Sequence, residues 1–236
     1  MLAVLTEITD YDATAITSVV VRVVAPGMYF QEHRIIDDEY YERLSAQTPV
    51  APLHIPTVLE EIAQLRSALP EAKLIGASDS AFHATLPSVA RRYSLDPTFA
   101  DKADLYRFGY HGLSVSSVLR RVHAVTGRDW SRVVVCHVGS GVSVTAVKDG
   151  QSVETTMGFS PGSGLIMNTR AGDLDAGALL EVMRKRHLRP LDAQSFIQAN
   201  GGLLGLTGHA DLRAVLDGAA KQEPLATAAL QMFTYH

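Results

Sequence analysis

Cysteine is almost absent from this chain of 236 residues, which contains only Cys136. A single thiol cannot form a disulfide within the chain, so the disulfide-stapled folds of small secreted proteins are excluded. Cys136 lies within an apolar segment, and we interpret it as a small core residue rather than as a nucleophile. These features fit a reducing compartment, and we expect a cytoplasmic protein.

Long apolar runs and clusters of basic residues are also lacking. No apolar segment approaches the roughly 20 residues that span a bilayer, and the N-terminus shows no basic segment followed by a sustained apolar one. The formal net charge is −4, and no basic cluster suggests a nucleic-acid or membrane surface. We therefore expect no nucleic acid and no membrane as a partner. A small anionic ligand would have to be bound by individual arginines.

Three common catalytic motifs are missing as well. The chain has no GxSxG elbow, no CxxC pair and no GxxxxGK[ST] loop, which argues against serine hydrolase, zinc-ribbon and P-loop proteins. Hydrophobic residues make up 47% of the sequence, which is enough for a substantial core. The composition is that of an ordinary globular protein.

The most informative stretch lies in the middle of the chain, at residues 132–175. It reads RVVVCHVGSGVSVTAVKDGQSVETTMGFSPGSGLIMNTRAGDLD. The β-branched run at its start predicts a buried strand, and the alternation that begins at Val142 predicts a second strand. Asp149 and Gly150 suit a tight hairpin turn, after which Val153 begins a third strand. We therefore expect three consecutive strands here.

A short glycine turn separates the first two of these strands. Gly139 and Gly141 flank Ser140, so the backbone can approach a ligand closely and successive N–H groups can form a concave anion site. A phosphate would suit such a site. A plain hairpin turn is the alternative that the residues leave open.

Two charged residues stand in or beside predicted strands nearer the N-terminus. Arg22 interrupts the apolar run of residues 19–24, so it must pair with a carboxylate, point into a cleft or face solvent at a sheet edge. Asp79 directly follows a short predicted strand at residues 73–77, where α/β sheets commonly bind ligands. Capping of a following helix is the alternative for Asp79.

Helices are predicted between the strands. Apolar spacing predicts one helix over residues 57–69 and another that is capped by Ser114 and ends at Gly127, with Val118 and Val125 among its inward residues. The order strand, helix, strand, hairpin places the chain in the mixed α/β class.

The C-terminal third contains further helices and glycine-rich segments. We expect helices over residues 178–185 and from Pro224 onward, and a glycine-rich loop at residues 201–208. In the last helix, Leu225, Ala229, Met232 and Phe233 should face inward. The last helix reaches the end of the sequence with no cap, glycine or tail, and from this we expect a truncated chain.

Two further residues are candidates for anion binding. His111 lies between a glycine and a predicted helix start and could bind an anion when protonated, although a loop histidine is the alternative. Arg170 is the one cation among the small residues that follow Thr155, and Asp173 and Asp175 either pair with it or cap the next helix.

Several segments occur together in an order that is specific to one family. They are VVRVVAPG (20–27), VAPLHIP (50–56), SDSAFHATLP (78–87), RFGYHGLS (107–114), the stretch at 133–175 and GGLLGLTGHADLR (201–213). Together they resemble the acetokinase family, which includes acetate, propionate and butyrate kinases. The resemblance extends from about Val19 to the end of the chain.

This resemblance implies the fold of the acetate and sugar kinase, Hsp70 and actin superfamily, a ribonuclease H-like mixed sheet flanked by helices, here incomplete. Residues 1–130 would belong to the N-terminal family domain and residues 131–236 to the start of the C-terminal one. The implied reaction is reversible transfer of the γ-phosphoryl group of ATP to a short-chain carboxylate, acetate or propionate, with Mg²⁺, giving an acyl phosphate and ADP. The implied assembly is a homodimer.

The resemblance also implies roles for individual residues. Arg22 and Arg170 would hold the carboxylate and the migrating phosphoryl group, Asp79 would be the essential active-site carboxylate, and His111 would stabilise the transition state. His137, together with the glycine turn, would hold phosphate. No residue is assigned as a metal ligand.

The chain departs from the family pattern at several points. Val21 and Ala25 replace the two histidines of GHRVVHGG, Pro26 replaces a glycine, and Ser140 replaces the asparagine of HLGNG. The NAGSSS and GGIGENS segments of the family do not occur in the sequence, so we expect truncation at both ends. The alternative to an enzyme is therefore an inactive remnant or fragment that keeps the central fold and a dimer or anion-binding surface.

Overall fold

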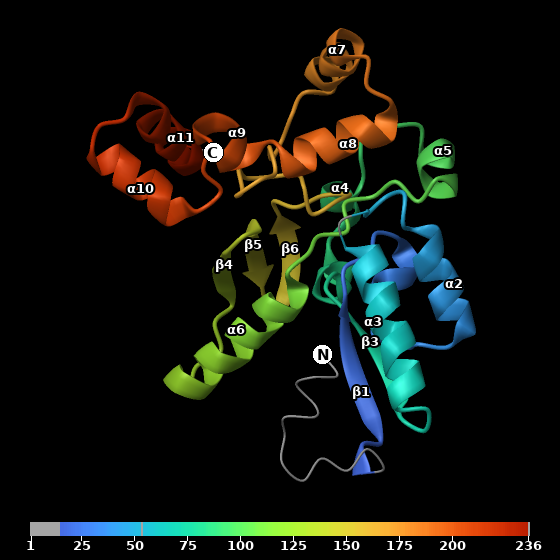
Figure 1. Ribbon diagram of the computed structural model, residues 1–236. Helices are drawn as coiled ribbons and strands as arrows, with labels where there is room; N and C mark the ends of the chain where they lie inside the picture. Colours follow the sequence, from blue (N-terminus) through green and yellow to red (C-terminus); the bar gives the residue numbers. More distant parts are fainter. Residues whose placement is uncertain (1–14, 53, 236) are drawn as a thin grey trace. The chain divides into compact units, whose positions relative to one another are not determined.

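The computed structural model describes residues 15–52 and 54–235, which form helices and two separate sheets (Figure 1). The mixed α/β class is therefore confirmed. The chain divides into two compact units, Met1–Ala81 and Phe82–His236, and each is described by itself. The division at residue 130 concerns the two family domains and stays a prediction. Leu53 of the VAPLHIP segment and His236 of the last predicted helix lie outside the described residues.

The first unit contains a three-stranded sheet. Its order is β1 (Ser18–Val23), β3 (Lys73–Ser78) and β2 (Arg34–Ile35), with β1 parallel and β2 antiparallel to β3. The predicted strands at 19–24 and 73–77 are thus both confirmed. Arg22 pairs in register with Ala77. Asp79, which is two positions beyond Ala77, therefore lies near the Arg22 side chain.

Beside this sheet, the described part of the first unit contains the helices α2 (Asp38–Ala46) and α3 (Ile55–Ala68) and a short 3-10 helix, η2 (Met28–Phe30). Helix α3 begins two residues before the predicted start and carries Pro56 in its first turn, where a missing N–H costs no hydrogen bond. Helix α2 was not predicted, because its segment is polar and only Tyr40 and Leu44 are buried. Both residues join the apolar core that α3 and the sheet share.

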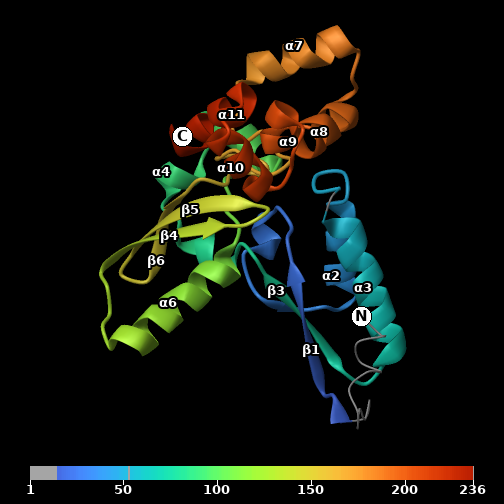
Figure 2. The same ribbon diagram turned by 60° about the vertical axis from the view of Figure 1, so that its left-hand side comes forward.

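The sheet of the second unit is an antiparallel meander of β4 (Arg132–Val138), β5 (Val142–Lys148) and β6 (Gln151–Thr155). All three strands were predicted from the sequence. Helix α6 (Gly112–Thr126) packs along β4 in both ribbon views (Figures 1 and 2). Val115 of the helix meets Val135 and Val147 of the sheet in a small buried cluster.

Strand β4 is buried on one face only, which corrects two predictions. Val135 is buried, whereas Val134, Val138 and Cys136 on the opposite face are exposed. The continuous apolar run therefore does not indicate a fully buried strand, and Cys136 is not a core residue. Side chains alternate across a strand, so Cys136 faces away from α6 when Val135 faces toward it.

Helix α6 also differs from its prediction. It begins at Gly112, and its N-cap residue is His111 rather than Ser114. Val118 and Val125, which we expected to face inward, are exposed. The exposed residues lie on a face of the helix that is not covered by the sheet, whereas Leu119 packs against the buried cluster of Val115, Val135 and Val147.

The segment at 201–208 is a helix rather than a loop. Helix α9 (Gly202–Thr207) packs with α10 (Leu212–Ala220) and α11 (Pro224–Tyr235) through a core that includes Leu203 and Val215. Burial of the leucines outweighs the weak helix preference of glycine. In α11 the buried residues are Ala226 and Ala229, whereas Leu225 and Met232 are exposed, so their predicted inward orientation was wrong.

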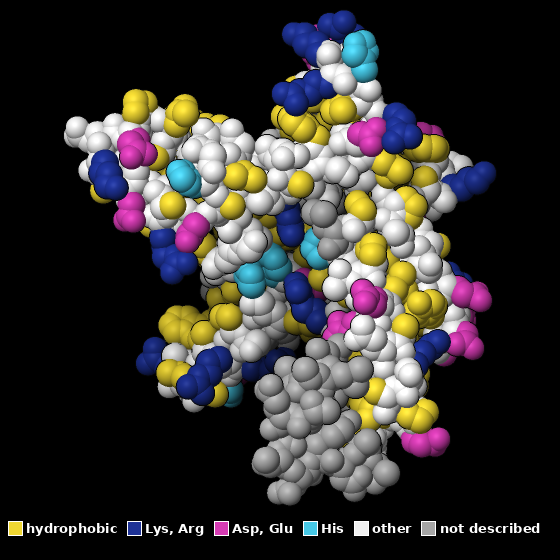
Figure 3. Space-filling model, in the orientation of Figure 1, with side chains coloured by type: hydrophobic (Ala, Val, Ile, Leu, Met, Phe, Trp, Pro, Cys, Tyr) yellow, Lys and Arg dark blue, Asp and Glu magenta, His cyan; other side chains and the backbone are white. Residues whose placement is uncertain are grey.

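Four helices complete the second unit, and they are α4 (Ser88–Arg91), α5 (Pro97–Lys102), α7 (Ala176–Arg186) and α8 (Pro190–Ala199). Helix α7 has no buried residue and is stabilised by local contacts. Asp175 caps its N-terminus, and Lys and Arg side chains gather over its last turn (Figure 3), where they complement the helix dipole. None of the helices in the described ranges is long and apolar enough to cross a membrane.

Gly76 in β3 allows a close contact with helix α2. A Cβ atom at this position would lie 2.5 Å from the Tyr40 hydroxyl oxygen and 2.8 Å from Tyr40 Cζ. The Tyr40 ring is fully buried, and burial raises the pKa of its phenol. Its hydroxyl has no hydrogen-bond partner among the described residues. The contact therefore depends on shape, not on hydrogen bonding.

We predict that Gly76→Ala lowers the free energy of unfolding by about 1–3 kcal/mol, because the new methyl group overlaps the Tyr40 ring. In a Tyr40→Phe background the nearest atom is gone but Cζ remains, so the same substitution should cost less without becoming neutral. Urea denaturation of the four proteins, followed by circular dichroism, measures both losses. Equal losses in the two backgrounds would show that Tyr40 is not the residue that Gly76 accommodates.

Candidate active site

Arg22 and Asp79 form a two-pronged ion pair in the first unit. Arg22 Nε donates to Asp79 Oδ1 at 3.1 Å and Arg22 Nη2 donates to Asp79 Oδ2 at 2.9 Å. The register of the parallel strands brings them together, and the Asp79 backbone N–H also bonds to Val23 O. Asp79 is buried, whereas the Arg22 side chain is 56% exposed. Of the alternatives open for Arg22, the structure shows a carboxylate partner, and the pair leaves much of the cation accessible.

The chain around Asp79 is held by its neighbours in the same unit. Ser78 Oγ donates to Phe30 O and accepts from the Ser80 N–H. The Ser78 N–H donates to His33 Nδ1 at 3.1 Å, so that ring nitrogen carries no proton. These bonds fix the turn after β3, and with it the position of the Asp79 carboxylate.

The glycine turn between β4 and β5 lies in the second unit beside two stacked histidines. The rings of His111 and His137 have centroids 3.9 Å apart and planes inclined by 22°. His111 Nδ1 lies 2.8 Å from Ser143 Oγ, and His137 Nδ1 lies 2.9 Å from Ser114 Oγ. Two predicted site residues from separate segments are thus held in one place.

The opposite edges of both rings face the glycine turn. A Cβ atom on Gly141 would lie 3.1 Å from His111 Nε2, and one on Gly139 would lie 3.6 Å from His137 Nε2. The backbone of the turn is closed by the Gly139 N–H, which donates to Gly141 O at 3.0 Å. The turn and the two imidazoles therefore form one small polar surface.

Arg170 joins the same surface. Its Nη1 would lie 3.5 Å from a Cβ on Gly141 and donates to Pro161 O at 2.9 Å. The loop that carries Arg170 is attached to the turn, since the Asn168 N–H bonds to Ser140 O at 3.4 Å. The Arg170 guanidinium and the His111 imidazole thus converge at Gly141, and the His137 ring stacks on that of His111 beside Gly139. Nitrogen donors of this kind suit an anion.

The segment that carries His111 adopts an uncommon backbone conformation. His111 has φ 62°, in the left-handed region that non-glycine residues rarely occupy. Such strain persists only where the surroundings impose it, and it is found preferentially at functional sites. His111 is also buried, which fixes its ring against the sheet.

His83 contributes to this restraint, although the sequence analysis gave it no role. It is fully buried, its Nε2 lies 2.9 Å from Tyr110 O, and its Nδ1 lies 2.9 Å from Ser152 Oγ. A carbonyl can only accept, so Nε2 carries the proton. Gly109 allows this approach, because a Cβ there would lie 2.6 Å from the His83 ring. The signal available in the sequence was the position of His83 within SDSAFHATLP.

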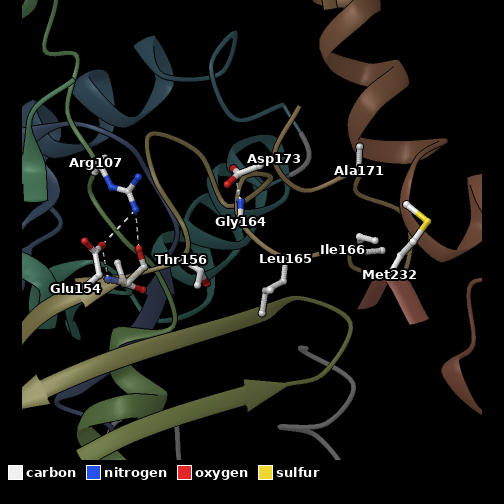
Figure 4. Close-up of a pocket in the computed structure, with 10 residues that line it drawn as sticks. Arg107, Glu154, Thr156, Gly164, Leu165, Ile166, Ala171, Asp173 and Met232 are labelled. Atoms are coloured by element: carbon white, nitrogen blue, oxygen red, sulfur yellow. Dashed lines mark hydrogen bonds and ion pairs between the residues drawn. The ribbon is translucent and has the colours of Figure 1, made fainter. Parts of the chain in front are cut away.

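A cavity of about 430 Å³ in the second unit contains none of the predicted catalytic residues (Figure 4). Arg107 lies at one side, where its Nη2 donates to Glu154 Oε1 at 3.2 Å and Thr155 O at 2.7 Å. Asp173 lines the cavity and accepts from the Gly164 N–H. Asp175 caps α7. Asp173, through its bond to Gly164, connects the two ends of the loop that contains Arg170.

Among residues 15–52 and 54–235, no group of three or more His, Cys, Asp or Glu side chains could hold a metal ion. The Asp79 carboxylate accepts from Arg22 at both oxygens. Mg²⁺ commonly binds through one or two carboxylates together with substrate phosphates. The described residues therefore offer no preformed cluster of carboxylates for a resident Mg²⁺ ion.

A family model described as the acetokinase family matches residues 1–236. The chain belongs to the acetokinase family. It is 38% identical over 224 residues to the acetate kinase of Brachyspira hyodysenteriae. The match covers 95% of this chain and 57% of that relative. The family resemblance that the motifs indicated is therefore confirmed.

Solved acetokinase structures show the same fold. The crystal structure of Porphyromonas gingivalis acetate kinase has a TM-score of 0.85 at 30% identity and covers 99% of this chain and 60% of its own. A propionate kinase from Francisella tularensis subsp. tularensis has a TM-score of 0.84 at 33% identity and covers 90% and 55%. The superfamily fold that we predicted is confirmed. This chain spans between 55% and 60% of the length of these three relatives.

The two glycines of the turn give a matched pair of substitutions. A Cβ on Gly141 is tightly placed at 3.1 Å from His111 Nε2, whereas a Cβ on Gly139 has ordinary contacts of 3.6 Å. We predict that Gly141→Ala displaces the His111 ring and shifts its side-chain NMR signals, while Gly139→Ala leaves them nearly unchanged. Matching His111 spectra for the two variants would contradict the close approach described here.

Proposed function

We propose that this chain carries the active-site residues of an acetate or propionate kinase, which transfers the γ-phosphoryl group of ATP to a short-chain carboxylate. The observation that carries the proposal is the convergence of His111, His137 and Arg170 at the glycine turn, within one unit. Phosphoryl transfer needs positioning and neutralisation of negative charge more than covalent chemistry, and three nitrogen side chains around an accessible backbone supply both.

The reaction brings anions together. A carboxylate oxygen forms a bond to the γ-phosphorus, the bond between that phosphorus and the bridging oxygen of ADP breaks, and ADP leaves with the electron pair. Carboxylate and phosphate repel each other, so cations must offset that repulsion before the reacting atoms can approach. Mg²⁺ bound to the nucleotide would neutralise part of the charge on the phosphate oxygens.

The side chains have distinct proposed roles. Arg170 and Arg22 bind the migrating phosphoryl group and the carboxylate, and arginine suits both because its fork pairs with two oxygens at once. His111 donates to the phosphoryl oxygens as their charge spreads in the transition state. Asp79 orients the Arg22 guanidinium, since both of its oxygens accept from that residue.

The phosphate-holding role proposed for the turn rests on its backbone and on His137. Gly139, Ser140 and Gly141 have no bulky side chains, and the Nε2 edges of both histidines lie beside them. ATP and ADP are therefore proposed as substrates of the family reaction.

A non-catalytic remnant is the competing proposal. The departures at Val21, Ala25 and Ser140 favour it. In that case the cluster at the glycine turn would bind a small anion without turnover. The expectations of a homodimer, a cytoplasmic location and no nucleic-acid or membrane partner stay predictions. The net charge of −4 supports the last of these.

The decisive experiment measures acyl phosphate formation by the purified chain with Mg·ATP and acetate or propionate, trapped with hydroxylamine. We expect turnover that falls by about 100-fold or more in Arg170→Ala, because a cation that offsets transition-state charge is lost. The matched control is Arg213→Ala, since Arg213 is an exposed arginine paired only with Asp211 near the start of α10. Its turnover should equal that of the unsubstituted protein.

If circular dichroism shows that the protein is folded and no turnover is detected, the proposal for this chain is refuted and the remnant is favoured. Equal turnover in Arg170→Ala and Arg213→Ala would contradict the assignment of Arg170. The same assay on Arg22→Ala tests the first unit separately, because that substitution leaves the cluster at the glycine turn intact.

A further inference from the structure

We propose that Ser143 and Ser114 are positioning residues that hold His111 and His137 as neutral tautomers protonated at Nε2. The stacked pair then offers two N–H donors to a phosphate at the glycine turn without two adjacent positive charges. This inference rests on the proposed function of the same site, since it specifies how the site recognises a phosphate.

The first argument is geometric. Each histidine has its Nδ1 within hydrogen-bond distance of a serine hydroxyl, 2.8 Å for His111 and 2.9 Å for His137. Each has its Nε2 edge beside a glycine of the turn. A hydroxyl that donates to Nδ1 leaves the ring proton on Nε2, which is the nitrogen that faces the turn. Both serines have the same placement relative to their rings, and where each hydroxyl donates to Nδ1 the two select the same tautomer.

The second argument is electrostatic. Two imidazolium rings with centroids 3.9 Å apart would repel each other strongly in a partly buried site. The Arg170 guanidinium approaches the same point at Gly141 and further disfavours a positive charge on His111. Neutral rings avoid this repulsion. A neutral ring with a bare Nε2 would present a lone pair to the phosphate, so protonation at Nε2 is the form that binds.

The third argument concerns what the serines would otherwise do. Ser143 is fully buried in β5, where it is the register partner of His137 in β4. Ser114 is the third residue of α6, and its hydroxyl lies 2.9 Å from His137 Nδ1. The hydroxyls of Ser143 and Ser114 thus each form a hydrogen bond with a histidine of the site.

The test reads the tautomers directly. In protein labelled with ¹⁵N at histidine, two-bond ¹H–¹⁵N spectra at mildly alkaline pH distinguish a protonated Nε2 from a protonated Nδ1. We expect the Nε2–H pattern for His111 and His137 in the unsubstituted protein. Ser143→Ala should convert His111 to a mixture of tautomers, and Ser114→Ala should do the same for His137 alone.

Ser152→Ala is the matched control. Ser152 is an equally buried serine in the neighbouring strand β6, and its hydroxyl lies 2.9 Å from Nδ1 of His83. Its substitution should change the His83 signals and leave those of His111 and His137 in place. If Ser143→Ala proves unstable, Ser143→Cys keeps nearly the same volume with a much weaker donor and should give the same change of tautomer.

Binding of inorganic phosphate, followed through the same histidine signals, completes the test. We expect the affinity to fall about 2-fold in Ser143→Ala, because an even mixture of tautomers leaves about half of the molecules with the N–H donor at His111 Nε2. Nδ1–H tautomers in the unsubstituted protein, unchanged tautomers in the serine variants or equal phosphate affinities would each overturn the inference. Tautomers and phosphate binding that respond as expected in a protein without turnover would support it and refute only the kinase activity.

Discussion

The absence of a side chain at Gly141 is the constraint on which the second unit's candidate site depends. A Cβ there would lie 3.1 Å from His111 Nε2 and 3.5 Å from Arg170 Nη1, so only glycine lets both groups reach the turn without displacement. Neighbouring residues fix the backbone from which the His111 ring reaches the turn. Gly109 admits the His83 ring, His83 bonds to Tyr110 O, and the adjacent His111 takes a left-handed backbone conformation. Close backbone packing, and not a large hydrophobic core, sets the geometry of these residues.

In the first unit, the register of the sheet brings the candidate site residues together. Arg22 and Asp79 are 57 positions apart in sequence, and parallel pairing of β1 with β3 places them side by side. The sequence placed each of them correctly at or beside a strand, because β-branched runs and glycine or proline boundaries are local signals. It could not show that the two residues pair, since register is decided by contacts between distant segments.

The failures of sequence reasoning have a common physical origin. The strands at 132–155 were predicted well, yet Cys136 was assigned to the wrong environment, because an apolar run does not reveal which face of a sheet is covered. The glycines of 201–208 suggested a loop, but burial of Leu203 made a helix. His83 was overlooked because its role depends on a carbonyl 27 positions away. Local preference predicted the elements, and tertiary packing decided their faces and partners.

The departures from the family pattern affect the core of the first unit more than its charged pair. Val21 is 2% exposed and Ala25 is fully buried, and both belong to the apolar cluster that includes Phe30 and Tyr40. A histidine in such surroundings would need buried hydrogen-bond partners, whereas valine and alanine need none. Arg22 nevertheless keeps its two bonds to Asp79. Val21 and Ala25 are thus compatible with a well-packed first unit in which Arg22 and Asp79 are paired, so these two replacements by themselves do not indicate a lost reaction.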